Sequence, residues 1–87
     1  MSYNYQIEKQ RIFTEEGQKD FLAFRDRANE LIKIAGAFRL MEAFGSGDTF
    51  FQTACVDRMV ELGELVEFVR PCWGQYRVFT TPQVHNR

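Results

Sequence analysis

The side chains most often used in catalysis and metal binding are few in this chain and far apart in sequence. His85 is its only histidine and lies in the polar tail, and its two cysteines are Cys55 and Cys72. Nucleophilic catalysis needs a Ser or Cys beside a base, and structural zinc sites need closely spaced Cys and His ligands. The spacing matches neither pattern, so the sequence predicts no enzyme activity, no metal site and no cofactor.

Two further patterns could carry chemistry but have simpler interpretations. Three glutamates recur every third residue: Glu61, Glu64 and Glu67. Gly63 stands among them and should end the helix, so they do not form one carboxylate face. Residues 45–47, Gly-Ser-Gly, resemble part of a phosphate-binding loop but lack the Lys and Ser or Thr that must follow. We interpret them as a turn between helices.

Composition limits the chain to one small globular domain. It has 87 residues, 45% hydrophobic and 15% aromatic, which is enough for one modest core. Eleven Lys and Arg against twelve Asp and Glu leave a net charge of −1, so any site for a polyanion must be local. No apolar run approaches the roughly 20 residues of a membrane span, and MSYNYQIEKQ lacks the apolar centre of a signal peptide. Two cysteines give no disulfide framework, so we expect a cytoplasmic protein.

The first half of the chain predicts one long helix after an ambiguous start. Residues 1–13 place tyrosines and an isoleucine at alternating positions, which fits either an edge strand or a loose arm. Thr14 and the acidic residues after it are typical of a helix N-terminus, and Gly36 marks its end. The apolar positions of this helix are Phe21, Phe24, Ala28, Leu31 and Ala35. Residues 38–40 then fit a brief strand, and 41–44 fit a short helix.

The second half predicts a capped helix followed by a hairpin. Asp48 is a good cap for a helix over 49–62, and Gly63 supplies the stop. We draw its inward stripe through Phe51, Cys55, Val56, Met59 and Leu62, with Cys55 as a small core residue. The outward side is then Phe50, Thr53, Ala54, Asp57 and Glu61. Runs of branched and aromatic residues at 65–69 and 76–79, around a turn at 71–75, predict two paired strands.

This order of elements resembles a winged helix-turn-helix domain, and the resemblance covers residues 37–79. Within it, CVDRMVELGELVEF is similar to the end of a recognition helix and the first wing strand, and GQYRVF is similar to the returning strand. The wider sequence also looks like small uncharacterised proteins of phages and prophages. We therefore expect an α+β fold with three helices and a C-terminal hairpin wing over 14–81, an N-terminal extension over 1–13 and a tail over 82–87.

The resemblance implies a DNA-binding regulator of phage type, since the outward side of the third helix of such domains enters the major groove. The candidate DNA contacts are Arg39, Thr49, Gln52, Thr53, Arg70 and Arg77. Phosphate contacts supply much of DNA affinity, yet Arg58 is the only cation of the third helix. For each arginine outside that helix, a solvated or glutamate-paired side chain is the favoured interpretation over a phosphate contact. A homodimer through the first helix or the N-terminal segment would double this footprint.

The alternative is a winged-helix scaffold that binds a protein, such as a host or phage component. Its candidate contacts are Phe50, Asp57, Glu61 and Trp73. The two acids would repel phosphate, whereas Trp73 is placed at the predicted wing tip and tryptophan often anchors interfaces. The favoured alternative for Trp73 is that it folds back to complete the small core. On the strength of the fold we place DNA first and a protein partner second.

Overall fold

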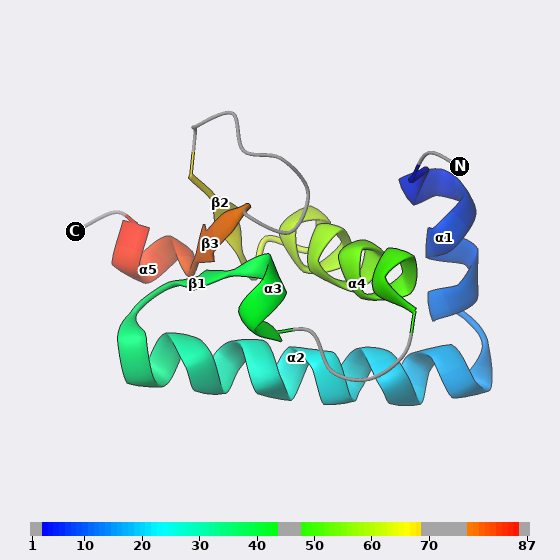
Figure 1. Cartoon of the computed structure of the whole chain (residues 1–87), viewed down its shortest axis with the longest axis horizontal. Helices are drawn as coiled ribbons and strands as arrows, with labels where there is room; N and C mark the ends of the chain where they lie inside the picture. The colour runs from blue at the N-terminus through cyan, green and yellow to red at the C-terminus, as the bar shows by residue number, and fades with distance from the viewer. Residues whose placement is uncertain (1–2, 44–47, 69–76, 86–87) are drawn as a thin grey trace.

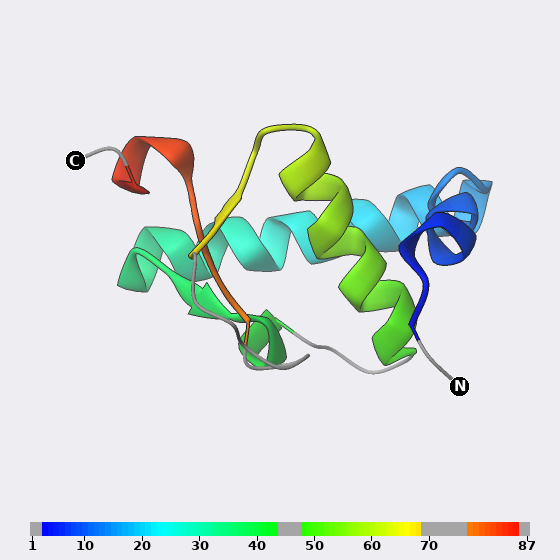
Figure 2. The same ribbon diagram turned by 90° about the horizontal axis from the view of Figure 1, so that it is seen from above.

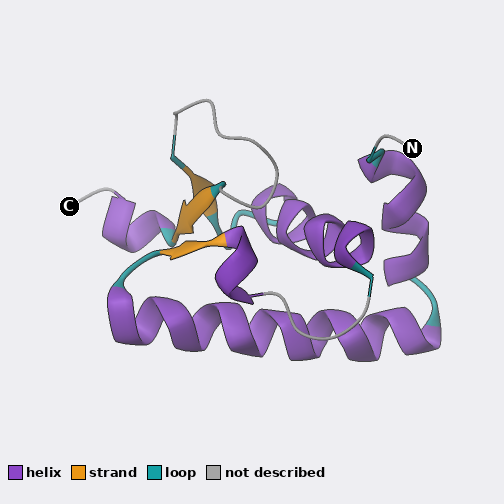
Figure 3. Ribbon diagram, viewed as in Figure 1, coloured by secondary structure: helices purple, strands orange, loops and turns teal. Residues whose placement is uncertain are grey.

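The computed structural model describes residues 3–43, 48–68 and 77–85. In chain order its elements are α1 Tyr5–Ile12, α2 Glu15–Ala35, β1 Phe38–Arg39, α3 Leu40–Ala43, α4 Thr49–Glu61, β2 Val66–Glu67, β3 Val78–Thr80 and α5 Pro82–His85. Helix α2 runs along one side of the molecule, with α1 standing at one end of it and the sheet and α5 toward the other (Figure 1). The fold is α+β, with most of the described chain in helices (Figure 3).

The predicted boundaries of the two longer helices are confirmed. The Thr14 hydroxyl accepts the backbone N–H three residues on at 3.0 Å, and the Asp48 carboxylate accepts the N–H of Phe50 at 2.8 Å. Gly36 caps the end of α2 with φ of 84°, and Gly63 follows α4 with φ of 78°. Glycine adopts this left-handed backbone at little cost, so both helices end close to the predicted positions.

The prediction of an edge strand or loose arm over residues 1–13 is wrong for the described part of that segment, because it contains α1. The Asn4 side chain caps this helix by accepting the N–H groups two and three residues later, at 3.0 and 3.3 Å. Good helix formers follow in Glu-Lys-Gln-Arg. Tyr3 therefore precedes the cap, whereas Tyr5 and Ile7 lie within the helix, so their alternating positions do not mark a strand.

The tail predicted over 82–87 also differs, because it begins with the short helix α5. Proline has no backbone N–H and a fixed φ, so it fits the first position of a helix, where that N–H would have no partner. Pro82 occupies this position.

The three strands form one antiparallel sheet in the order β1-β3-β2, so β3 is central. The predicted hairpin is confirmed as the β2–β3 pair, with Glu67 opposite Phe79. On the other edge Phe38 lies opposite Phe79, and their ring centroids are 5.7 Å apart. The strands are shorter than the predicted runs, and the turn at 71–75 lies outside the described residues.

The core fills the space between α2, α4 and the sheet, and Figure 2 shows α4 crossing over α2. The predicted inward stripe of α4 is confirmed for Phe51, Cys55, Val56 and Met59, which are buried. Leu62 is 47% exposed, because α4 ends at Glu61 and Leu62 lies beyond its last turn. No helix of the described ranges is long and apolar enough to cross a membrane.

Candidate functional site

The outer face of α4, defined here as Phe50, Ala54, Asp57 and Glu61, lies opposite the buried stripe of that helix. This is the side that the sequence predicted to point outward. In the structure, helix α1 packs beside α4 on this side (Figures 1 and 2). Ala54 is consequently 0% exposed, which corrects its assignment to the outward side. The candidate site is therefore an interface between two helices of one chain.

Asp57 is the centre of a hydrogen-bonded network at the first end of this interface. Its carboxylate accepts the Tyr3 hydroxyl at 2.7 Å and the Arg77 guanidinium at 2.7 Å. Arg77 also donates to both carboxylate oxygens of Glu67, at 2.8 and 2.9 Å. These bonds raise the pKa of Arg77, the Glu67 bond first, while burial and the bond to Asp57 raise the pKa of Tyr3. The network joins the N-terminal segment, α4, β2 and the start of β3.

Glu61 collects three donors one turn further along α4. It pairs with Lys9 at 2.8 Å and Arg58 at 2.6 Å, and it accepts the Tyr5 hydroxyl at 3.1 Å. The bonds from Lys9, then Arg58, lower the pKa of Glu61 to about 2. Burial and the bond to Glu61 raise the pKa of Tyr5 to about 12. At neutral pH the carboxylate is charged and the phenol is neutral, as these hydrogen bonds require.

Aromatic and ionic contacts hold the segment before α1 and the last turn of α1 against the start of α4. Tyr3 packs edge-on against Phe50, with ring centroids 5.9 Å apart. The Arg11 guanidinium lies 2.6 Å from Asp48 and 5.1 Å from the centre of the Phe51 ring. Asp48 therefore caps α4 and binds α1 at the same time.

The candidate DNA contacts that the structure describes do not come together on an open surface. Gln52 is only 5% exposed and lies on the buried side of α4, not on the outward side that the prediction requires. Arg77 is held between two carboxylates. Thr49 is exposed, and the Thr53 hydroxyl donates to its carbonyl oxygen at 2.8 Å.

Two arginines and the tryptophan complete the list of predicted contacts. The Arg39 side chain is 58% exposed and lies 3.7 Å from Glu42, the longest of the ion pairs described in the structure. Arg70 and Trp73 lie outside the described residues, so their predicted roles stay predictions. Of the alternative protein-binding set, Phe50, Asp57 and Glu61 do gather on one face. Phe50 and Asp57 both contact Tyr3, which precedes α1, and Glu61 contacts two residues of α1 itself.

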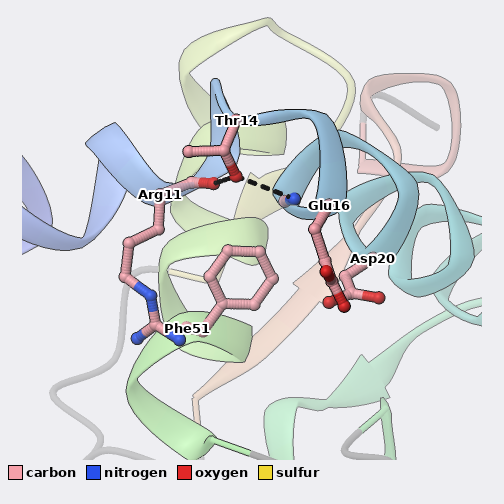
Figure 4. A pocket seen from close by; sticks show the side chains of 6 residues that line it. Arg11, Thr14, Glu16, Asp20 and Phe51 are labelled. Carbon is pink, nitrogen blue, oxygen red and sulfur yellow. Dashed lines mark hydrogen bonds between the residues drawn. The ribbon is translucent and has the colours of Figure 1, made fainter.

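A pocket of about 260 Å³ opens where α1, α2 and α4 meet (Figure 4). It is lined by Arg11, Thr14, Glu16, Gly17, Asp20 and Phe51. Thr14 caps α2, and Arg11 is paired with Glu8 and Asp48. The polar groups of both side chains therefore stabilise the helices. We assign this pocket no reaction.

Elsewhere in the described ranges, no three His, Cys, Asp or Glu side chains gather so as to hold a metal ion. Cys55 is fully buried, and that burial raises the pKa of its thiol to about 12. A thiol must ionise to act as a nucleophile, so Cys55 is a packing residue, as the sequence predicted.

Sequence reasoning missed the four residues that make the site: Tyr3, Tyr5, Lys9 and Arg11. A signal was present, since Asn4 can cap a helix that carries Lys9 and Arg11, while the predicted outward side of α4 carries two acids. Comparisons of the chain with protein-family models, curated proteins and solved structures give no match.

Proposed function

We propose that this protein is a non-catalytic binding module on a winged helix-turn-helix plan, and that the outer face of α4 binds a protein helix. The order α2, β1, α3, α4, β2, β3 supports this plan, because the resemblance predicts helix, strand, helix, helix and hairpin in that order. Fold alone does not assign function, so the choice of partner rests on the site.

The observation that carries the proposal is that the outer face of α4 already holds a helix through bonds that suit protein. Phe50 and Ala54 make the first half of this face apolar, and Asp57 and Glu61 make its second half acidic. Asp57 is bound by the hydroxyl of Tyr3, just before α1. Glu61 is bound by the Tyr5 hydroxyl and the Lys9 ammonium of α1. A duplex would instead bring phosphates toward these acids, and phosphate contact requires cations.

The cations near this face are also engaged. Arg58 pairs with Glu61 and Arg77 pairs with Asp57 and Glu67, so contact with phosphate would require those pairs to break. Partly buried, bidentate arginine pairs are stronger than exposed ones. This arrangement favours a protein partner over DNA.

A DNA-binding regulator of phage type is the second candidate, and the element order is the observation in its favour. It requires α1 to leave the outer face of α4. Thr49, Thr53 and Arg39 would then contact the groove and backbone, with Arg70 as the predicted wing contact.

A fragment experiment tests the preferred function. A chain that begins at residue 14 is checked for folding by circular dichroism and titrated with a labelled peptide of residues 1–13. We expect saturable binding with a gain of helicity, because the peptide replaces α1. A peptide with Tyr3→Phe and Lys9→Ala should bind roughly five- to thirtyfold more weakly, because it lacks two polar contacts worth ~1–2 kcal/mol together. A shortened chain that folds but does not bind the native peptide would contradict the proposal.

A further inference from the structure

Helices α1 and α2 are joined by a hinge of two residues, Phe13 and Thr14. Figure 4 shows the Thr14 hydroxyl between the Arg11 carbonyl, to which it donates at 2.8 Å, and the N–H of Gly17, which it accepts at 3.0 Å. Phe13 is 57% exposed and Thr14 is also exposed. Opening this hinge would therefore uncover little apolar surface at the hinge itself.

Gly17 is the residue that allows the hinge to close. A Cβ atom built on Gly17 would overlap the carbonyl oxygen of Arg11, because the end of α1 passes directly over the first turn of α2. Only glycine lacks that atom. If the hinge opened, residues 5–35 could run as one longer helix, in which glycine is disfavoured by about 1 kcal/mol relative to alanine. Glycine at position 17 thus fits the closed hinge, although it would weaken a continuous helix.

The contacts of α1 with α4 join residues far apart in sequence. The separations are 52 positions for Lys9 and Glu61, 54 for Tyr3 and Asp57, and 37 for Arg11 and Asp48. Each contact would be unchanged if α1 came from another copy of the chain. Exchange of an identical element is a low-cost route to a dimer, and short hinge loops favour it.

We propose that a second copy of this chain supplies α1 to the outer face of α4, so that two chains form a dimer by exchanging α1. This rests on the proposed function, in which that face binds a protein helix, and it names the partner. Within one chain Lys9 and Arg11 lie against Glu61 and Asp48, and an identical α1 from a second copy would meet the same charges. The choice of a second copy rests on the hinge, which presents α1 as a separate helix.

Crosslinking between two differently marked full-length chains tests the exchange. One chain carries Lys9→Cys and the other Glu61→Cys, and Cys72→Ser in both removes a competing thiol. The chains are mixed at high concentration, incubated, and treated with a short bis-maleimide. A dilute chain with both Lys9→Cys and Glu61→Cys shows that the pair can be bridged within one molecule.

We expect a crosslinked heterodimer that grows with concentration. Lys33→Cys in place of Lys9→Cys is the matched control, because Lys33 is exposed at the far end of α2. The exchange is refuted if the pair bridges within one chain but yields no more heterodimer than the Lys33→Cys control.

Gly17→Ala gives a second readout through the hinge. Alanine cannot fit the closed hinge but favours a continuous helix, so we expect the dimer dissociation constant from light scattering to fall about tenfold or more, with helicity retained. A folded variant that stays as monomeric as the native chain would overturn the proposal. If the variant does not fold, the crosslinking experiment, in which both chains retain Gly17, tests the exchange on its own.

Failure of the exchange and failure of the proposed function are distinguishable. A missing heterodimer leaves the peptide titration with the shortened chain unaffected. A shortened chain that folds but cannot bind the peptide removes the helix-binding face itself.

Discussion

Asp57 is the residue at which the N-terminal segment, α4 and the sheet are joined. It accepts hydrogen bonds from Tyr3 and Arg77, and its side chain is only 18% exposed. A partly buried carboxylate with two donors contributes more than a surface ion pair, because its loss leaves the Tyr3 hydroxyl without this acceptor and Arg77 with Glu67 alone. This one side chain therefore links three parts of the fold.

We expect Asp57→Ala to lower the free energy of unfolding by about 1–3 kcal/mol. The matched control is Glu42→Ala, which removes a carboxylate whose partner Arg39 is 58% exposed and should cost less than about 1 kcal/mol. Urea denaturation of both variants measures the difference. Equal losses would mean that Asp57 contributes no more than an ordinary surface charge.

Glu61 gives the interface a dependence on acid. Its pKa is about 2 in the folded chain against an ordinary value of 4.5, because Lys9 and Arg58 stabilise the carboxylate. A carboxyl whose folded pKa is depressed stabilises the fold above its ordinary pKa, and that stabilisation is lost as pH falls toward the folded value.

Stability at low ionic strength should therefore fall between pH of about 4.5 and about 2, and Glu61→Gln should reduce the slope. Urea midpoints measured across this range test the expectation. Because Glu61 is exposed, added salt should weaken the effect. An unchanged slope in the variant would show that the contacts of Glu61 do not contribute to folding.

At the scale of elements, α1 is held by one buried residue and several polar ones. Ile12 is 0% exposed, whereas Ile7, on the same helix, is 62% exposed. The attachment of α1 should therefore depend on Ile12.

We expect Ile12→Ala to cost about 2–5 kcal/mol of unfolding free energy, because it removes buried methyl groups and leaves a cavity. Ile7→Ala should cost far less, although both variants make the same change in helix propensity. Denaturation curves compare the two. Similar losses in the two variants would contradict the burial of Ile12 and the exposure of Ile7.

The longer helices and the hairpin could be predicted because their signals are local. Thr14 and Asp48 cap the helices, Gly36 and Gly63 end them, and apolar spacing marks the buried faces. The cover over α4 could not be predicted, since it depends on contacts between residues more than 50 positions apart, such as Tyr3 with Asp57.

The error at Gln52 has a different origin. Gln52 lies three residues before Cys55 and seven before Met59, so helical spacing places all three on one side of α4. The prediction made it a DNA contact near the N-terminus of the helix, whereas the structure places it with the buried stripe. Ala54 was assigned to the outward side, and its complete burial corrects that assignment.

At the scale of the whole molecule, the charges are nearly balanced and largely paired. The net charge is −1. Among the described residues, carboxylates pair with Lys9, Arg11, Arg25, Arg58 and Arg77. Such pairs leave little positive field to attract a polyanion, whatever the fold resembles.

The most direct test of the central claim, that the outer face of α4 serves protein and not DNA, is the fluorescence anisotropy of labelled random-sequence duplex DNA titrated with the full chain. The titration is made at about 50 mM and then about 200 mM salt, the range in which phosphate contacts weaken strongly. We expect no rise in anisotropy at either salt concentration. Tight binding at low salt that collapses at the higher salt would contradict the claim and favour a DNA-binding regulator.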